Sequence, residues 1–242
     1  MSKAASPSPQ THFSRAELLS VFASCGVEGE DAEQVVRQIA PRAIRTADRA
    51  DRWPEYEVLL EVVGLCTDDR HPFSYLSVPI TTGRAYLEYH AGAGQGAEGS
   101  ASHGRKLART DNERRAIAAA QRLRGKLPGT VIDPSRVAIS DWEQDDYHIF
   151  WVEVIKRYSE TVYFLDGWQY SDGCAIEFAT AVQLGLPALT EHMKPLDPSD
   201  GRALLRSAIA EYVSVGLDPV RLRRATERAE SVAAKDHFSR EA

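Results

Sequence analysis

The chain has 242 residues, of which 43% are hydrophobic and 26% are charged, proportions that are ordinary for a globular protein. Its net charge of −6 and isoelectric point near 5.7 exclude the basic footprint of a duplex nucleic-acid binder, although a mononucleotide needs only one local anion site. Cys25, Cys66 and Cys174 show neither a disulfide framework nor metal-ligand spacing. No apolar run is long enough for a membrane span and no secretory signal is visible, so we expect a cytoplasmic protein without metal or cofactor.

The first part of the chain predicts helices after a disordered tail. Residues 1–12 are small and polar and contain proline, a composition typical of disorder. Ser14 and Glu17 have the spacing of a capping box at a helix start. Two more helices are expected over 29–40 and 54–65, where apolar residues recur at helical spacing.

These helices predict a division of the chain into three structured parts. We expect a helical N-terminal extension over 13–70, an α/β domain over 71–195 and C-terminal helices over 196–242. A lid, a dimerisation element and a module that docks a partner are all open roles for the extension.

The α/β domain is expected to begin with a strand over 73–80, FSYLSVPI. Thr81, Thr82, Gly83 and Arg84 follow it as a polar loop, a composition that an ordinary turn would also show.

The stretch 91–104, AGAGQGAEGSASHG, is rich in glycine, alanine and serine. It has neither a Walker pattern nor a dinucleotide fingerprint. We interpret it as a flexible insertion over the mouth of a site, with a simple linker as the alternative. His103, Arg105 and Lys106 lie at its end, where they could close on an anion.

The middle of the domain continues the α/β alternation. Residues 111–127 predict a helix, and 129–134 predict a second strand that runs parallel to the first through this crossover. The segment 140–160 predicts a long helix, with Ser140 and Asp141 as candidate caps.

The most informative stretch follows, from residue 160 to 190. Residues 161–165 are β-branched or aromatic, which is typical of a strand buried on both faces. Ser171 can cap the next helix through its hydroxyl, and Gly185 stands where that helix should end. A further strand is expected over 187–190.

Glu177 lies one and a half turns into this helix, close to the carboxyl end of a parallel strand. An open α/β sheet normally places its site there. A lone helical glutamate is more often a solvated charge, so spacing alone leaves both interpretations open. Cys174 is better explained as a small, semi-buried filler than as a reactive thiol.

Residues 167–177 read G-W-x-x-S-x-G-x-x-x-E and are followed by Ala181 and Gly185. This run resembles the nucleoside 2-deoxyribosyltransferase-like superfamily, most of all its small phage and bacterial members. The related deoxynucleoside 5′-monophosphate glycosidases share S-x-G-x-x-x-E, although Ala175 stands where the family often has a second glycine. The resemblance covers 75–190 and implies a doubly wound, mainly parallel α/β sheet of the flavodoxin or Rossmann type.

The resemblance also implies roles for individual residues. Glu177 would be the nucleophile on the anomeric carbon of the sugar, and Ser171, beside Gly173, would hold a 5′-phosphate. An acidic residue in the preceding helix would assist. Asp145, Asp146 and Glu153 all lie near the corresponding position, and Asp146 or Glu153 is the preferred candidate, with a solvated helix charge as the alternative for either. In the family, the loop after the first strand contacts ribose and phosphate. The resemblance therefore assigns substrate binding here to Tyr75, Ser77, Pro79, Thr81, Gly83 and Arg84. Members of the glycosidase branch often have serine and arginine where Pro79 and Thr81 stand.

The turn itself offers further contacts. Trp168 and Tyr170 are candidates for stacking on a nucleobase, whereas core packing is the better explanation for Trp151. Asp166 either binds a sugar hydroxyl or braces the turn, and bracing is the simpler role.

The expected function is cleavage or transfer at the N-glycosidic bond of a (deoxy)nucleoside or nucleoside monophosphate, through a covalent glycosyl ester. A non-catalytic nucleotide-binding or signalling module is one alternative, favoured by the extra helices and by the residues at Pro79 and Thr81. An NAD-cleaving glycohydrolase is another, because the related TIR fold also uses a glutamate on an N-glycosidic bond.

Two helices are expected at the end of the chain, over 201–215 and 219–238. The last is strongly charged with a thin apolar stripe, which usually packs on one partner surface. Together with the oligomers common in the superfamily, this predicts a homo-oligomer.

Overall fold

The computed structural model describes most of the chain. Its backbone is described over residues 11–46, 51–67, 72–93 and 100–240, and its side chains over the same ranges except at 11, 93, 100–102 and 232–240. Most of the expected disordered tail therefore lies outside the described residues. Its last two residues form strand β1 (Thr11–His12), which pairs antiparallel with β2 (Ile44–Arg45), so the predicted tail was too long at its end.

The centre of the molecule is a parallel sheet of four strands in the order β4-β3-β5-β6. The strands are β3 (Ser74–Ser77), β4 (Val131–Ile132), β5 (Thr161–Phe164) and β6 (Ala188–Thr190). The α/β class and the parallel pairing are confirmed. The first two strands are shorter than predicted because Pro79 and Pro134 have no N–H to donate to a neighbouring strand.

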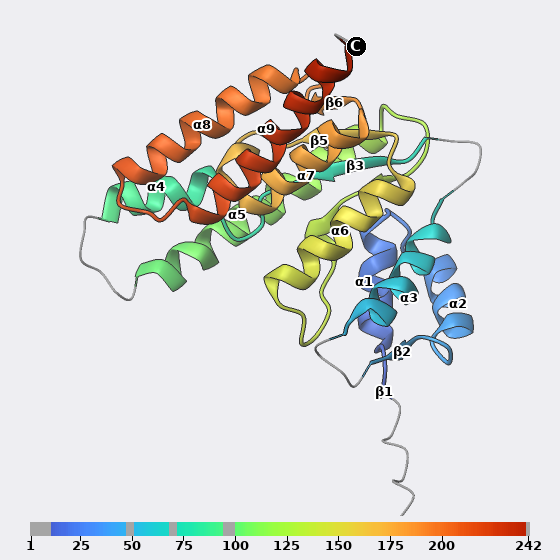
Figure 1. Ribbon diagram of the computed structural model, residues 1–242. Coiled ribbons are helices and arrows are strands. Elements are labelled where there is room, and N and C mark those ends of the chain that lie inside the picture. The colour runs from blue at the N-terminus through green and yellow to red at the C-terminus, as the bar shows by residue number, and fades with distance from the viewer. Residues whose placement is uncertain (1–10, 47–50, 68–71, 94–99, 241–242) are drawn as a thin grey trace, which may run out of the picture.

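Helices cover both faces of this sheet (Figure 1). The long helix α5 (Ser100–Arg124) packs on one face, where Leu76, Val131 and Tyr163 form a core with its alanines. Helices α6 (Gln144–Tyr158) and α7 (Asp172–Leu184) belong to the core on the other face. After β3 the chain continues to β4 on one side of it, and after β5 it continues to β6 on the other side. The carboxyl ends of β3 and β5 therefore form a topological switch point.

The two ends of the glycine-rich stretch are helical, so the prediction of a flexible insertion over the whole of 91–104 was wrong at its ends. Helix α4 (Arg84–Ala93) and the first turn of α5 take up residues 91–93 and 100–104, and 94–99 lie outside the described residues. Gly104 lets the two helices approach, since a Cβ there would lie 2.4 Å from Cδ1 of Tyr89. Glycine is therefore required at position 104, because any side chain there would collide with Tyr89.

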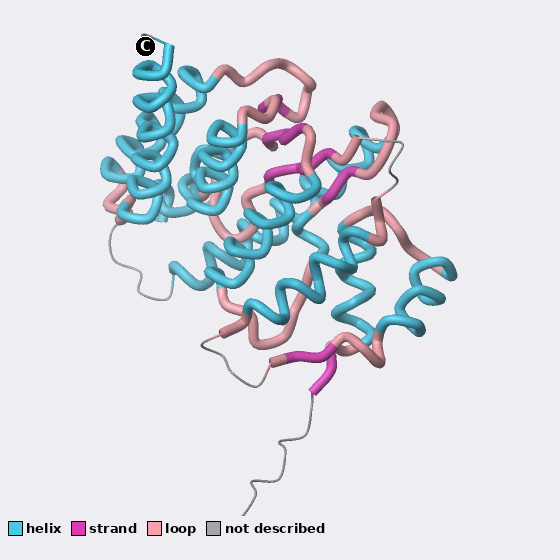
Figure 2. The backbone as a smooth tube through the Cα atoms, turned by 45° about the vertical axis from the view of Figure 1, so that its right-hand side comes forward, coloured by secondary structure: helices cyan, strands magenta, loops and turns pink. Residues whose placement is uncertain are grey.

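The N-terminal helices are α1 (Arg15–Ser24), α2 (Glu30–Ile39) and α3 (Trp53–Gly64). Ser14 and Glu17 form the predicted capping box at the start of α1. Figure 2 shows these helices beside the rest of the fold, and their apolar residues belong to the same core cluster as those of α6 and α7.

The chain ends with α8 (Pro198–Ser214) and α9 (Val220–Arg240), and α9 packs along α7 (Figure 1). Short 3₁₀ turns follow β4 and β5, at Pro134–Arg136 and Trp168–Tyr170. Within the described part of the chain, no helix combines the length and the apolar character needed to cross a membrane.

Candidate active site

Two residues of β3 and one residue of α7 form a buried cluster at the switch point. Tyr75 donates a hydrogen bond through its hydroxyl to Oε1 of Glu177 at 2.6 Å, and Ser77 donates through its hydroxyl to Oε2 at 2.6 Å. Tyr75 and Ser77 point to the same side of the strand because they are two residues apart. Each oxygen of the Glu177 carboxylate therefore has its own donor.

Burial controls the ionisation of this cluster. Desolvation raises the pKa of Glu177 to about 7, while the hydrogen bonds from Ser77 and Tyr75 act in the opposite direction. Burial, together with the charge of Glu177, raises the pKa of Tyr75 well above its usual value. Tyr75 therefore remains a protonated donor, and Glu177 changes charge near neutral pH.

The turn that precedes α7 has the predicted caps. Gly167 adopts a left-handed conformation, φ 85°, and a Cβ there would lie 3.2 Å from Cβ of Arg84. The hydroxyl of Ser171 accepts a hydrogen bond from the Cys174 amide at 3.5 Å and so caps the helix, and Gly185 ends it in a left-handed conformation. These local interactions fix where α7 begins and ends, and so place its first turns beside the end of β3.

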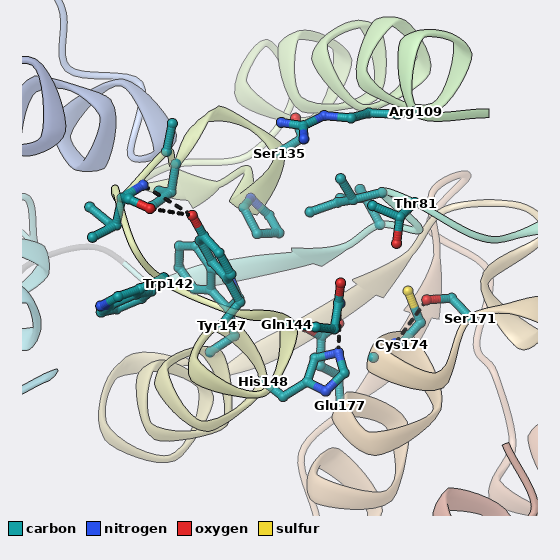
Figure 3. A pocket seen from close by; sticks show the side chains of 18 of the residues that line it. Thr81, Arg109, Ser135, Trp142, Gln144, Tyr147, His148, Ser171, Cys174 and Glu177 are labelled. Atoms are coloured by element: carbon teal, nitrogen blue, oxygen red, sulfur yellow. Dashed lines mark hydrogen bonds between the residues drawn. The ribbon is translucent and has the colours of Figure 1, made fainter. Parts of the chain in front are cut away.

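Glu177 lines a cavity of about 600 Å³, a size that suits a small organic ligand. Figure 3 shows Ser171, Cys174 and Glu177 on one wall, and Thr81, Ser135 and Arg109 across from them. The aromatic side chains that line it are Trp142, Tyr147 and Trp151.

The N-terminal extension contributes one wall of this cavity. Ser14 and Glu17 line it. The carboxylate of Glu17 accepts hydrogen bonds from the Ser140 amide at 2.8 Å and from Arg45 at 3.2 Å. Arg45 in turn donates to the Ser140 carbonyl at 2.7 Å. These contacts fasten the loop before α6, which lines the cavity, to the N-terminal helices.

His148 lines the cavity from α6, and the sequence analysis did not select it. Its Nε2 lies 2.9 Å from the side-chain nitrogen of Gln144, one turn earlier on the same helix (Figure 3). A Cβ at Gly173 would lie 2.9 Å from this Nε2, so the imidazole packs against the first turn of α7. The signal available in the sequence was the Gln144–His148 spacing of four residues, which places both side chains on one helix face.

The two acidic residues proposed as partners of Glu177 lie elsewhere. Asp146 accepts a hydrogen bond from the Glu143 amide at 2.7 Å as the second half of a capping box, and one from the Tyr56 hydroxyl at 2.7 Å. Glu153 pairs with Lys156 at 2.7 Å. The described lining of the cavity includes neither residue. Asp145, on the exposed side of α6, lies 4.0 Å from Nδ1 of His148.

The aromatic residues are arranged differently from the prediction. Trp168 is buried, with its ring 4.9 Å from that of Phe164 and 4.8 Å from that of Phe178, so it belongs to the core. Trp151, for which core packing was the better explanation, is buried and also lines the cavity. The Tyr170 hydroxyl donates a hydrogen bond to Oε1 of Glu211 at 2.9 Å.

Among the residues of the β3 loop, Thr81 reaches the cavity. Gly83 has φ 96° and packs against Pro79, and Arg84 lies over the ring of Tyr170 at 5.1 Å. Asp166 is exposed, and its carbonyl accepts a hydrogen bond from Arg115 at 2.8 Å, a contact that braces the turn.

A second cavity of about 630 Å³ adjoins the first and shares Thr81 and Gln144 with it. Arg105 lines this second cavity from α5, together with Arg221 of α9. In the described part of the chain, no group of His, Cys, Asp and Glu side chains is placed to hold a metal ion.

No protein-family model matches the chain, and neither a curated protein nor a solved structure is significantly similar to it. Its function must therefore be inferred from the residues and geometry of the site.

Proposed function

We propose that this protein cleaves or transfers the N-glycosidic bond of a nucleoside or deoxynucleoside 5′-monophosphate, with Glu177 as the nucleophile. One observation carries the proposal: Glu177 is a buried carboxylate on a cavity wall, and both of its oxygens accept hydrogen bonds from the strand beside it. The resemblance of the G-W-x-x-S-x-G-x-x-x-E turn to the nucleoside 2-deoxyribosyltransferase-like superfamily supports the same chemistry. The strand order favours a flavodoxin-like member of the doubly wound folds.

The chemistry follows from the state of this carboxylate. In its ionised form, one oxygen of Glu177 attacks C1′, and the base leaves with the electrons of the glycosidic bond. The transition state resembles an oxocarbenium ion, so a fixed negative charge also stabilises it electrostatically. Water or a second base then displaces the carboxylate from the glycosyl ester. Tyr75 and Ser77 hold the carboxylate in one orientation throughout.

The remaining walls can accommodate the rest of the substrate. The amino end of α7 at Ser171 and Gly173 favours a phosphate, because a helix N-terminus presents free amides and a partial positive charge. Tyr147 and Trp151 present aromatic surface suited to a nucleobase. A mononucleotide combines both of these parts with the sugar that Glu177 attacks.

The test is a chromatographic assay for the free base. Wild type, Glu177→Gln and the matched surface variant Glu160→Gln are incubated with deoxynucleosides, their 5′-monophosphates and NAD, with and without an acceptor base. We expect wild type and Glu160→Gln to release base and Glu177→Gln to release none. A folded wild type that releases base from no member of the panel would refute the proposal and favour a binding module, and release from NAD alone would identify a glycohydrolase.

A further inference from the structure

Glycosidic cleavage needs a proton as well as a nucleophile, and this inference rests on the proposed function. When the C1′–N bond breaks, its electron pair goes to the base, which is a poor leaving group unless a group on the protein protonates it. Glu177 cannot supply that proton, because it must be ionised to attack. The donor should therefore be another titratable side chain on the cavity wall.

Three of the described titratable side chains there are unsuitable. Burial acts to raise the pKa of Glu17, but hydrogen bonds from Ser140 and Ser14 outweigh it, so its pKa lies below the ordinary value and it stays ionised. Tyr147 exchanges hydrogen bonds with the backbone of Ile139, and burial raises its pKa. Burial also raises the pKa of the Cys174 thiol.

His148 is the remaining candidate, and its position on the cavity wall suits a proton donor. Its ring packs against Gly173 in the first turn of α7, and Glu177 stands four residues further along that helix, on the same helix face as Gly173. Both His148 and Glu177 line the cavity, and Figure 3 shows them among the lining residues. The side-chain N–H of Gln144 donates to Nε2 at 2.9 Å and holds the neutral ring; when the ring is protonated, the Gln144 amide turns its oxygen to this nitrogen. His148 is only 14% exposed, so it is shielded from most solvent contact.

We propose that His148 is the general acid that protonates the departing base. Glu177 forms a bond to C1′ as the C1′–N bond breaks, and the proton moves from the imidazolium to the base nitrogen. The products of this step are a glycosyl ester, a neutral base and a neutral imidazole. In the second step the imidazole takes the proton of the incoming water or acceptor base, which restores the imidazolium and the free carboxylate.

Charged groups on three helices surround this ring. Burial lowers the pKa of His148, Asp172 of α7 and Asp145 of α6 raise it, and Arg221 of α9 lowers it, with a net lowering. Arg221 also lies 3.5 Å from Asp145 and 3.7 Å from Asp172, which reduces the influence of both carboxylates. Because the net effect is a lowering, the pKa of His148 lies below its ordinary value of 6.5, and the imidazolium is lost on the acidic side of neutrality. Glu177 has a pKa of about 7, so only a minor fraction of the protein carries the imidazolium and the ionised carboxylate together, and activity on an ordinary base should fall as the pH rises further.

The experiment compares two leaving groups. 2′-Deoxyguanosine 5′-monophosphate needs a proton on its base, whereas its N7-methylated form already carries a positive charge and leaves without one. With His148→Gln we expect a loss of about 10²-fold or more in kcat on the first substrate, and a loss below about 5-fold on the second, because general acid catalysis is then unnecessary. The alkaline decline in rate should disappear as well.

Two controls separate catalysis from folding. His192→Gln makes the same chemical change at an exposed histidine outside the described cavity lining, and should leave both rates unaltered. Added imidazole should restore His148→Ala on the first substrate. Equal losses on both substrates, or no effect of His148→Gln, would overturn the inference while leaving Glu177 as nucleophile. A wild type that cleaves neither substrate and no other member of the base-release panel would instead refute the proposed function.

Discussion

Tyr75 donates a 2.6 Å hydrogen bond to Glu177, although 102 residues separate them in the chain. The contact joins the strand at the centre of the sheet to the helix that follows its neighbour. Hydrogen bonds to an ionised acceptor are short and strong. Strand β3 therefore fixes the position of the Glu177 carboxylate, and its hydrogen bonds partly offset the effect of burial on the Glu177 pKa.

Tyr75→Phe should make Glu177 harder to ionise. The hydrogen bond lowers the carboxyl pKa, and a bond to a charged group is worth about 1.5–3 kcal/mol, so its loss should move the acidic limb of the activity profile upward by about 1–2 pH units. Activity should fall at pH 7 and recover partly in alkali. Tyr163→Phe, on the opposite face of the sheet, is the matched control. Superimposable pH–rate profiles for wild type and Tyr75→Phe would contradict this role.

Glu177→Gln should change how stability depends on pH. The Glu177 pKa is about 7 in the folded protein against an ordinary 4.5, so the folded chain holds this proton more tightly than the unfolded chain. Ionisation between these values lowers the free energy of unfolding, on the order of 3 kcal/mol in total, and the loss is complete above the folded pKa. Urea denaturation should therefore show that the free energy of unfolding of Glu177→Gln increases relative to that of wild type between pH 4.5 and pH 8. Parallel stability curves would show that burial does not raise this pKa.

Glu17→Ala should weaken both the fold and the cavity wall. It removes the acceptor for Ser14, Ser140 and the mostly buried Arg45, so we expect a loss of about 3 kcal/mol in the free energy of unfolding. Substrate KM should rise more than kcat falls, because the loop at Ser140 lines the cavity. Glu33→Ala breaks only a surface pair with Arg15 and should cost less than about 1 kcal/mol. Equal costs for the two variants would argue against the buried network.

Gly173→Ala should displace His148 without unfolding the protein. The added methyl group would lie 2.9 Å from Nε2 of His148, a side-chain atom that can move away. Alanine also has the better helix propensity, so the thermal midpoint should change little. Activity should fall in parallel with that of His148→Gln. Gly92→Ala, where a Cβ meets nothing within 4 Å, is the control. Unchanged activity in Gly173→Ala would mean that the imidazole position is unimportant.

Local chemistry in the sequence determined where several elements begin and end. The capping box of Ser14 and Glu17, the cap at Ser171 and the left-handed Gly185 are all formed, because these bonds reach across only three or four residues. The α/β alternation and the parallel sheet were also predictable, since short apolar strands joined by helices have few other solutions. Helix α4 was not predicted, although most of its residues have good helix propensity, because its last residues belong to the glycine-rich stretch that was interpreted as a flexible insertion.

Only the tertiary structure decided which side chains share the cavity. The periodicity of α6 predicts a helix but does not say how that helix is rotated about its own axis. The observed rotation turns Gln144 and His148 to the cavity, while Asp146 and Glu153, seven residues apart, form contacts elsewhere. The wall at Glu17 depends in the same way on packing between distant segments. Such contacts are set by the complementarity of whole surfaces, and no short stretch of sequence contains that information.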